Sequence, residues 1–182
     1  MNRRERDDAG LWQVAMEPTM RCMKNSPTTA LLLLLLISIA SITLAPAADL
    51  PSGTAKGTCA KDGAVPVALA YAGAFVDQKD ERKPTLLILS DVKLPTGTWT
   101  SEFDLMRATG KLPFSGAIFF LDKDGAVFRT DFYWKGRQSS VSGYFKLKLD
   151  NKAGKELTGA VASGEGEAKD PKVDATFHAT LK

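Results

Sequence analysis

The chain contains few of the side chains that most often carry covalent or metal chemistry. Its 182 residues include two cysteines and one histidine. Cys59 is the only cysteine after residue 47, so a chain processed there forms no internal disulfide. A structural zinc site needs four nitrogen or sulfur ligands, which His178 and Cys59 cannot supply within one chain. The sequence therefore predicts no metal and no cofactor, and it favours a half-buried strand position for Cys59 over a reactive thiol.

A strong excess of one charge is also missing. Lysine and arginine number 24 against 21 aspartates and glutamates, a formal net charge of +3. The first 47 residues hold five of the basic and four of the acidic side chains, so the 135 residues after them carry +2. These basic side chains are scattered, whereas nucleic-acid binding needs a clustered positive surface. We therefore expect no nucleic-acid partner.

No apolar run is long enough for an ordinary transmembrane helix. The longest, residues 30–44, is about fifteen residues long, against the roughly twenty that span a bilayer. It follows Lys24 and precedes small residues at Ala45 and Ala47, which is the order found in a secretory signal peptide. We expect residues 1–47 to be a leader cut after Ala47. The expected location is periplasmic or secreted, without stable membrane insertion after cleavage.

The start of this leader leaves two questions open. Residues 1–22 carry mixed charges that a signal peptide does not need, so Met20 and Met23 are alternative starts of translation. The alternative to cleavage is a protein anchored in the membrane by an uncleaved signal. Cys22 precedes the apolar run, which is the wrong side for a lipid-anchored form.

Residues 48–182 are expected to form a single β-domain, a length that can bury a core without covalent staples. Asp62-Gly63 fits a tight hairpin turn, and Ser101 can cap a short helix that ends at Ala108 and stops at Gly110. The alternation of apolar and polar residues, or short runs apolar on both faces, predicts strands. The predicted strands are 53–60, 65–75, 84–90, 114–121, 126–134, 141–149, 157–162 and 173–181.

About eight strands with short turns and one short helix predict an all-β fold, because strands and helices do not alternate. The sequence leaves open whether the domain is an antiparallel sandwich or a partly closed barrel. Strands that follow one another from Phe114 onward are expected to pair, since the links between them are short.

Four segments together resemble a loose family of uncharacterised exported bacterial all-β domains, in which a hairpin leads into an Ala-Tyr-Ala strand. The resemblance spans most of residues 48–182 and has Asp62-Gly63 where Asn-Gly is expected. It implies a β-domain and export, and it carries over no catalytic residues. The segments are Gly57-Thr58-Cys59-Ala60-Lys61-Asp62-Gly63, Val67-Ala68-Leu69-Ala70-Tyr71-Ala72, Leu86-Leu87-Ile88-Leu89-Ser90-Asp91 and Val173-Asp174-Ala175-Thr176-Phe177-His178-Ala179.

The sequence offers no catalytic motif. His178 falls on the polar side of the last strand, where catalysis would need a serine or cysteine to converge on it. The segment 122–125 starts like a calcium loop, but a strand resumes at Ala126, which favours a hairpin turn. Glu102 and Asp104 lie near the loop 91–97, which could border a pocket. They carry the alternative hypothesis, a hydrolase-like enzyme that uses carboxylates.

One surface is a candidate for recognition. Strand alternation places five side chains together on the outward face of a hairpin, with Phe128, Phe132 and Trp134 on the inward face. Exposed tyrosines beside complementary charges could bind a partner, although cross-strand support of a solvated sheet predicts the same residues. The five candidate binding residues are Arg129, Asp131, Tyr133, Tyr144 and Lys146.

These observations favour a small exported binding or interaction module over an enzyme. The expected partner is an envelope protein or a small ligand, bound through a sheet face or the loop ends.

Overall fold

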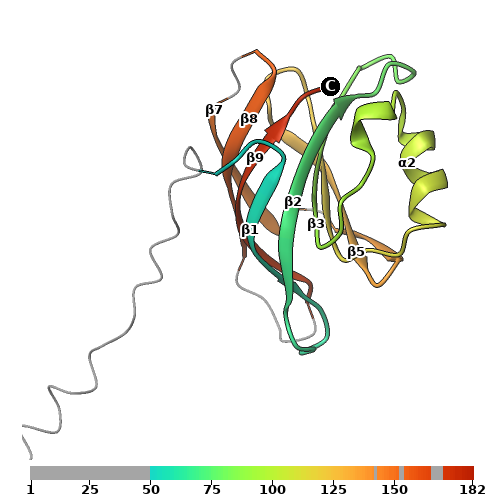
Figure 1. The fold of residues 1–182 in the computed structure, drawn as a ribbon. Coiled ribbons are helices and arrows are strands. Elements are labelled where there is room, and N and C mark those ends of the chain that lie inside the picture. The colour runs from blue at the N-terminus through green and yellow to red at the C-terminus, as the bar shows by residue number, and fades with distance from the viewer. Residues whose placement is uncertain (1–49, 142, 152–153, 165–169) are drawn as a thin grey trace, which may run out of the picture. The chain divides into compact units, whose positions relative to one another are not determined.

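The computed structural model describes residues 50–141, 143–151, 154–164 and 170–182, and the predicted leader lies outside these ranges. The described residues form nine strands, one α-helix and one short 3-10 helix (Figure 1). The first strands and helices are β1 (Thr54–Ala60), β2 (Val67–Val76), β3 (Thr85–Ser90), η2 (Thr96–Thr98) and α2 (Glu102–Thr109). The remaining strands are β4 (Gly116–Leu121), β5 (Val127–Trp134), β6 (Arg137–Val141), β7 (Phe145–Asn151), β8 (Glu156–Ser163) and β9 (Lys172–Thr180).

All nine strands belong to one sheet with the order β6-β5-β4-β3-β2-β1-β9-β8-β7, and every pair of neighbours is antiparallel. The sheet curls into a half-barrel, and α2 lies against the outer side of the half that contains β2 to β5 (Figure 1). The all-β prediction with one short helix is thus confirmed. Of the two architectures left open, the continuous curled sheet corresponds to the partly closed barrel.

The local signals at the first turn and the helix act as the sequence predicts. Asp62 and Gly63 have positive φ angles of 56° and 67°, which a tight turn between β1 and β2 requires. The hydroxyl of Ser101 accepts a hydrogen bond from the amide of Asp104 and so caps α2. Gly110 ends the helix, with a right-handed φ of −65° in place of the left-handed form.

The main core fills the concave side of the sheet. It draws on all nine strands, β6 only through the partly buried Val141, and it brings Phe119 of β4 and Phe132 of β5 against Phe145 of β7, with ring centroids 6.1 and 6.4 Å apart. This packing joins opposite halves of the curl, because β5 and β7 are not neighbours in the sheet.

A second core lies on the convex side, between β2 to β5 and the chain that contains α2. Phe75, Ile88 and Ile118 of the sheet pack there with Trp99 and Leu105 of the covering segment. β3 and β4 therefore face a core on both sides, which explains why their sequences are apolar on both faces.

The predicted strand 141–149 is wrong as a single element. Val141 ends β6, which pairs with β5, whereas Phe145 begins β7, which pairs with β8. β6 and β7 are the two edge strands of the sheet, although they follow each other in the chain. The expected pairing of successive strands from Phe114 onward holds at every step except this one.

Candidate functional site

Arg129, Asp131 and Tyr133 share one face of β5, as predicted, but that face is covered by the segment containing α2. Asp131 is 1% exposed and Tyr133 is 3% exposed. The carboxylate of Asp131 accepts hydrogen bonds from four donor atoms. The donors are Arg129 Nε at 3.2 Å, Arg129 Nη2 at 2.5 Å, Gln138 Nε2 at 2.9 Å and Ser140 Oγ at 2.8 Å. This buried charge is therefore paired and fully hydrogen-bonded.

Arg129 joins the sheet to the helix. Its Nη2 lies 2.9 Å from Oε1 of Glu102, the first residue of α2, and its guanidinium carbon lies 4.2 Å from the centroid of the Phe120 ring. Burial by itself lowers the pKa of Arg129, but the hydrogen bonds that Arg129 donates to Asp131 and Glu102 outweigh it and raise the pKa above its ordinary value. The guanidinium is thus held in one place by two carboxylates and an aromatic ring.

Asp77 fixes the loop that faces this arginine. Its buried Oδ1 accepts hydrogen bonds from the amides of Lys79 at 2.8 Å and Asp80 at 3.2 Å, and its Oδ2 accepts one from the amide of Glu102 at 2.8 Å. One carboxylate therefore orders the loop after β2 and binds a free amide at the start of α2.

The same loop carries a second arginine stacked on a second phenylalanine. Arg82 binds both oxygens of Asp80, at 3.2 and 3.0 Å, and its guanidinium carbon lies 4.9 Å from the centroid of the Phe128 ring. Phe128 is 44% exposed. We predicted it in the core, and this is wrong: the pairing of β4 with β5 skips Phe128, so a bulge turns its ring to the convex side beside Phe120.

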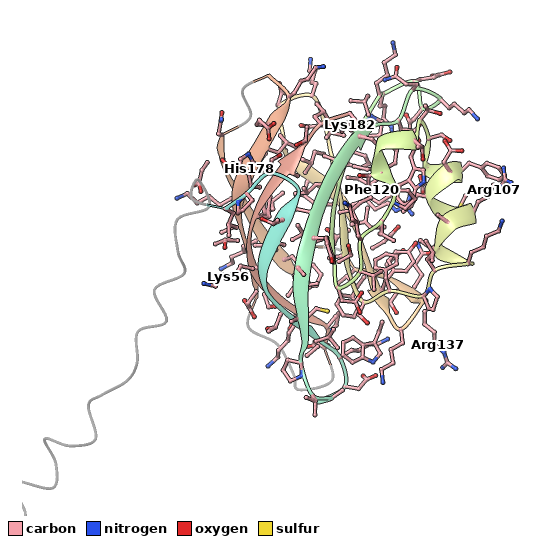
Figure 2. The ribbon with its side chains drawn as sticks, in the orientation of Figure 1. Lys56, Arg107, Phe120, Arg137, His178 and Lys182 are labelled. Atoms are coloured by element: carbon pink, nitrogen blue, oxygen red, sulfur yellow. The ribbon has the colours of Figure 1, made fainter. Side chains whose placement is uncertain are left out.

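These side chains line a hollow of about 400 Å³, here called the Phe128 pocket, whose walls come from the loop after β2, α2, β4, β5 and β6. Its chemically distinctive lining residues are Asp80, Arg82, Glu102, Phe120, Phe128 and Arg129. A second hollow, of about 450 Å³, shares Arg82 and Phe128 with it and is also bordered by Pro84 and Asp122. Figure 2 shows Phe120 between the strands and α2.

The structure separates the five predicted binding residues. Tyr133 packs parallel to Phe114, with ring centroids 4.7 Å apart, and burial followed by the nearby charge of Asp131 raises its pKa to about 12. Tyr144 packs against the concave core at the far edge of the sheet, and Lys146 is exposed on β7. Of the five residues, Arg129 alone lines the Phe128 pocket, and Asp131 supports it from behind.

His178 takes part in a structural cluster in the other half of the sheet, on β9 (Figure 2). Its Nδ1 donates to the carbonyl of Leu50 at 2.7 Å, and its Nε2 lies 2.9 Å from Oε2 of Glu156. The hydroxyl of Ser52 donates to the same Glu156 oxygen at 3.2 Å and also contacts the hydroxyl of Thr180. Because the carboxylate lies between the serine and the histidine, this arrangement lacks the contact that nucleophile activation needs.

The two carboxylates of the hydrolase hypothesis have different roles. Oδ2 of Asp104 accepts hydrogen bonds from the amide and hydroxyl of Thr100 and from the hydroxyl of Ser101, and the hydrogen bond from the Thr100 amide is the main cause of its lowered pKa. Asp104 is therefore engaged at the helix start. Glu102 lines the Phe128 pocket through its ion pair with Arg129.

The segment that resembles a calcium loop forms the turn of the β4–β5 hairpin. Oδ1 of Asp122 accepts hydrogen bonds from the amides of Asp124 at 2.8 Å and Ala126 at 2.9 Å, and Gly125 has a φ of 84°. Across the ranges that the structure describes, no three histidine, cysteine or acidic side chains are grouped to hold a metal ion. Within those ranges, no helix is long and apolar enough to cross a bilayer.

Sequence reasoning missed the loop 77–83, Phe120 and the polar side chains of β6. The signal that could have found the loop is Asp77 itself, because an aspartate directly after an apolar strand is typical of a side chain that hydrogen-bonds the backbone of the following turn. Comparison with known proteins finds no matching family model, no matching curated protein and no matching solved structure. The resemblance to exported β-domains therefore stays a prediction.

Proposed function

We propose that this protein is a small exported binding module and that the Phe128 pocket is its ligand site. One observation carries the proposal: a bulge displays a half-exposed phenylalanine beside a hollow whose central ion pair, Arg129 with Glu102, is already held in place. The volume of the hollow lies within the range of roughly 300–1,000 Å³ that is usual for small-molecule sites.

The rigidity of the pocket supports the proposal. Arg129 is fixed by Asp131, Glu102 and Phe120, while Asp77 holds both the loop of Arg82 and the start of α2. A preorganised site loses little conformational entropy when a ligand binds. A purely structural role explains the buried Asp131, but it leaves the exposed ring of Phe128 without a function.

A ligand screen with a matched pair of variants tests this function. The full-length chain is screened against a chemically mixed library of metabolites, peptides and glycans by thermal shift and by NMR. Phe128→Ala removes the ring at the pocket, and Phe103→Ala removes a somewhat more exposed ring on α2 that also lies under an arginine, Arg107. We expect hits that Phe128→Ala abolishes and Phe103→Ala retains. Hits that are unaffected by Phe128→Ala would overturn this assignment.

The export part of the proposal has its own test. It is supported by the apolar run 30–44 followed by Ala45 and Ala47. The protein expressed in a bacterial host should appear in the periplasm or medium, with Ala48 as its first residue by N-terminal sequencing. An uncleaved chain in the membrane fraction would support the anchored alternative.

A carboxylate-dependent hydrolase receives less support from the geometry, because Asp104 is engaged at the helix start and Glu102 is paired with Arg129. Hydrolysis of a panel of glycans and esters, lost in Glu102→Gln, would favour the enzyme over the binding module.

A further inference from the structure

Each charged side chain of the Phe128 pocket is already paired with an opposite charge. Arg82 makes two bonds to Asp80, and Arg129 is shared between Asp131 and Glu102. A charged ligand at the partly buried Arg129 would have to break one of its two ion pairs or lie beside a like charge, and both cost free energy. A neutral ligand leaves these ion pairs intact. The charge distribution therefore favours an uncharged ligand.

The two groups at the centre of the pocket keep one donor and one acceptor for that ligand. Within the described residues, Arg129 bonds through Nε and Nη2, and Glu102 pairs through Oε1. Nη1 of Arg129 and Oε2 of Glu102 thus remain, on groups whose paired atoms are 2.9 Å apart. A hydroxyl both donates and accepts, so two neighbouring hydroxyls match this donor and acceptor.

Phe128 adds an apolar surface next to these polar atoms. Its ring is half-exposed, and the side chain that covers it, Arg82, is itself 70% exposed and carried by a surface loop. Moving such a side chain aside costs little, since an exposed ion pair contributes little stability. The two hollows that share Phe128 provide room on more than one side of the ring.

From this combination we infer that the ligand is a neutral oligosaccharide. One sugar ring packs its C–H face on Phe128, and neighbouring hydroxyls of that or the adjoining ring bind Arg129 and Glu102. A chain of two or more rings runs from the first hollow into the second. This inference rests on the proposed binding function and names the ligand class for the same pocket.

The test measures binding of defined oligosaccharides to the full-length chain by isothermal titration calorimetry. The neutral probes are cellohexaose, maltohexaose, xylohexaose, mannohexaose and chitohexaose. An oligogalacturonate serves as the anionic probe and a chitosan oligomer as the cationic probe. The variants are Phe128→Ala, Phe128→Leu, Glu102→Gln and the control Phe103→Ala.

We expect at least one neutral probe to bind, with an affinity that added salt leaves nearly unchanged. Phe128→Ala should weaken that binding about tenfold or more, and Phe128→Leu should not restore it, because stacking needs the flat ring. Glu102→Gln should also weaken it, while Phe103→Ala should bind as the parent does.

The remaining outcomes distinguish the two proposals. Two outcomes would show that the ligand class is wrong while the binding site is still assigned to the Phe128 pocket. One is that only a charged oligomer binds, with strong salt dependence. The other is that the metabolite screen finds a Phe128-dependent ligand that is not a sugar. If no probe binds and the screen finds nothing, both proposals fail. Equal binding by Phe128→Ala and the parent would place any glycan elsewhere and overturn the assignment to this pocket.

Discussion

At the scale of single residues, the described domain buries ionisable groups in two ways. Asp77 and Asp131 are buried with a full set of hydrogen-bond donors, so their charge is stabilised by the protein. Cys59 is buried among apolar side chains of the concave core, where nothing stabilises a thiolate. The two aspartates are thus held by hydrogen bonds, whereas burial of Cys59 favours its neutral thiol.

Removal of the Asp131 carboxylate should destabilise the protein strongly. Asp131→Ala leaves Arg129 with one acid partner and leaves Gln138 and Ser140 without their acceptor, so we expect a loss of about 3 kcal/mol in the free energy of unfolding. Guanidinium titration followed by circular dichroism measures it. Asp150→Ala, which removes an exposed pair with Lys148, serves as the control and should change stability by less than about 1 kcal/mol.

Cys59 should resist alkylation in the folded protein. Burial, with a smaller contribution from the charge of Asp91, raises its pKa from 9.0 to about 12. Peptide mapping after iodoacetamide treatment at pH 9 should find this cysteine unmodified in native protein and modified in guanidinium. Modification of the native protein at the same rate would show that the β1 region opens readily.

The same shift gives a pH dependence with a defined sign. Above pH 9 the unfolded chain loses the thiol proton, while the folded chain keeps it until about pH 12, so the folded state binds more protons in this window. Stability therefore falls as the pH rises from 9 to 12. Cys59→Val should reduce the steepness of that fall in urea titrations.

At the scale of strands and helices, the sheet depends on close approach at its centre. Gly57 of β1 is paired with Ala175 of β9, and an added Cβ would lie 2.1 Å from the carbonyl oxygen of Asp174. No rearrangement of a flexible side chain can relieve that clash, because the obstacle is backbone. Glycine is thus required by the spacing of β1 and β9.

Gly57→Ala should accordingly cost about 2–3 kcal/mol of stability, the range for overpacking in a core. Gly97→Ala is the matched control, since the nearest atom to its added Cβ, outside its chain neighbours, is Lys182 Cε at 3.9 Å. Thermal unfolding followed by circular dichroism compares the melting temperatures of the two variants, and Gly57→Ala should melt at the lower temperature. Equal melting temperatures would show that β1 and β9 can move apart without loss.

Sequence alternation predicted most elements, because apolar and polar residues in a strand fall on opposite faces. It failed where the strand geometry departs from regular pairing. A bulge at Phe128 reversed the side of that residue, and the short link after Val141 hid a change from one edge of the sheet to the other. Such features depend on partners distant in sequence, so local patterns do not reveal them.

The candidate site was predicted only in part for the same reason. Arg129 and Asp131 were placed on one face of β5, but their contacts with Glu102 and the loop of Arg82 arise from the way α2 packs on the sheet. Tyr144 and Lys146 do not share this face, because the predicted strand 141–149 runs across the break between β6 and β7. The polar residues on this face of β5 favoured a recognition surface in the sequence analysis. The sequence does not show that α2 and its flanking segment bury most of that face.

At the scale of the whole molecule, two cores share one pair of strands. β3 and β4 place Leu87 and Phe119 in the concave core, and Ile88 and Ile118 in the convex one. Neither core can come apart without exposing side chains of these strands. Loss of either core should therefore propagate through the shared strands to the other.

Substitutions in either core should lower one common unfolding transition. Leu105→Ala, in the convex core, is expected to cost about 2–5 kcal/mol, and Val161→Ala, in the concave core, somewhat less. Tryptophan fluorescence and far-ultraviolet circular dichroism should report coincident transitions in both variants. Separate transitions in Leu105→Ala would mean that the helical cover unfolds independently of the sheet.

The seam between β1 and β9 has a consequence for how the polypeptide reaches its native state. The first and last described strands meet in the middle of the sheet, so a nascent or translocating chain delivered N-end first cannot complete that middle until residues 172–180 emerge. Until then one edge of β1 has no partner strand and its apolar side chains lack the β9 side of the concave core, so assembly must wait for a long-range contact, which forms slowly. A holding chaperone could therefore bind the incompletely paired β1 before β9 is available. A chain that ends before residue 172 would keep that edge exposed and would be an early target for proteolysis.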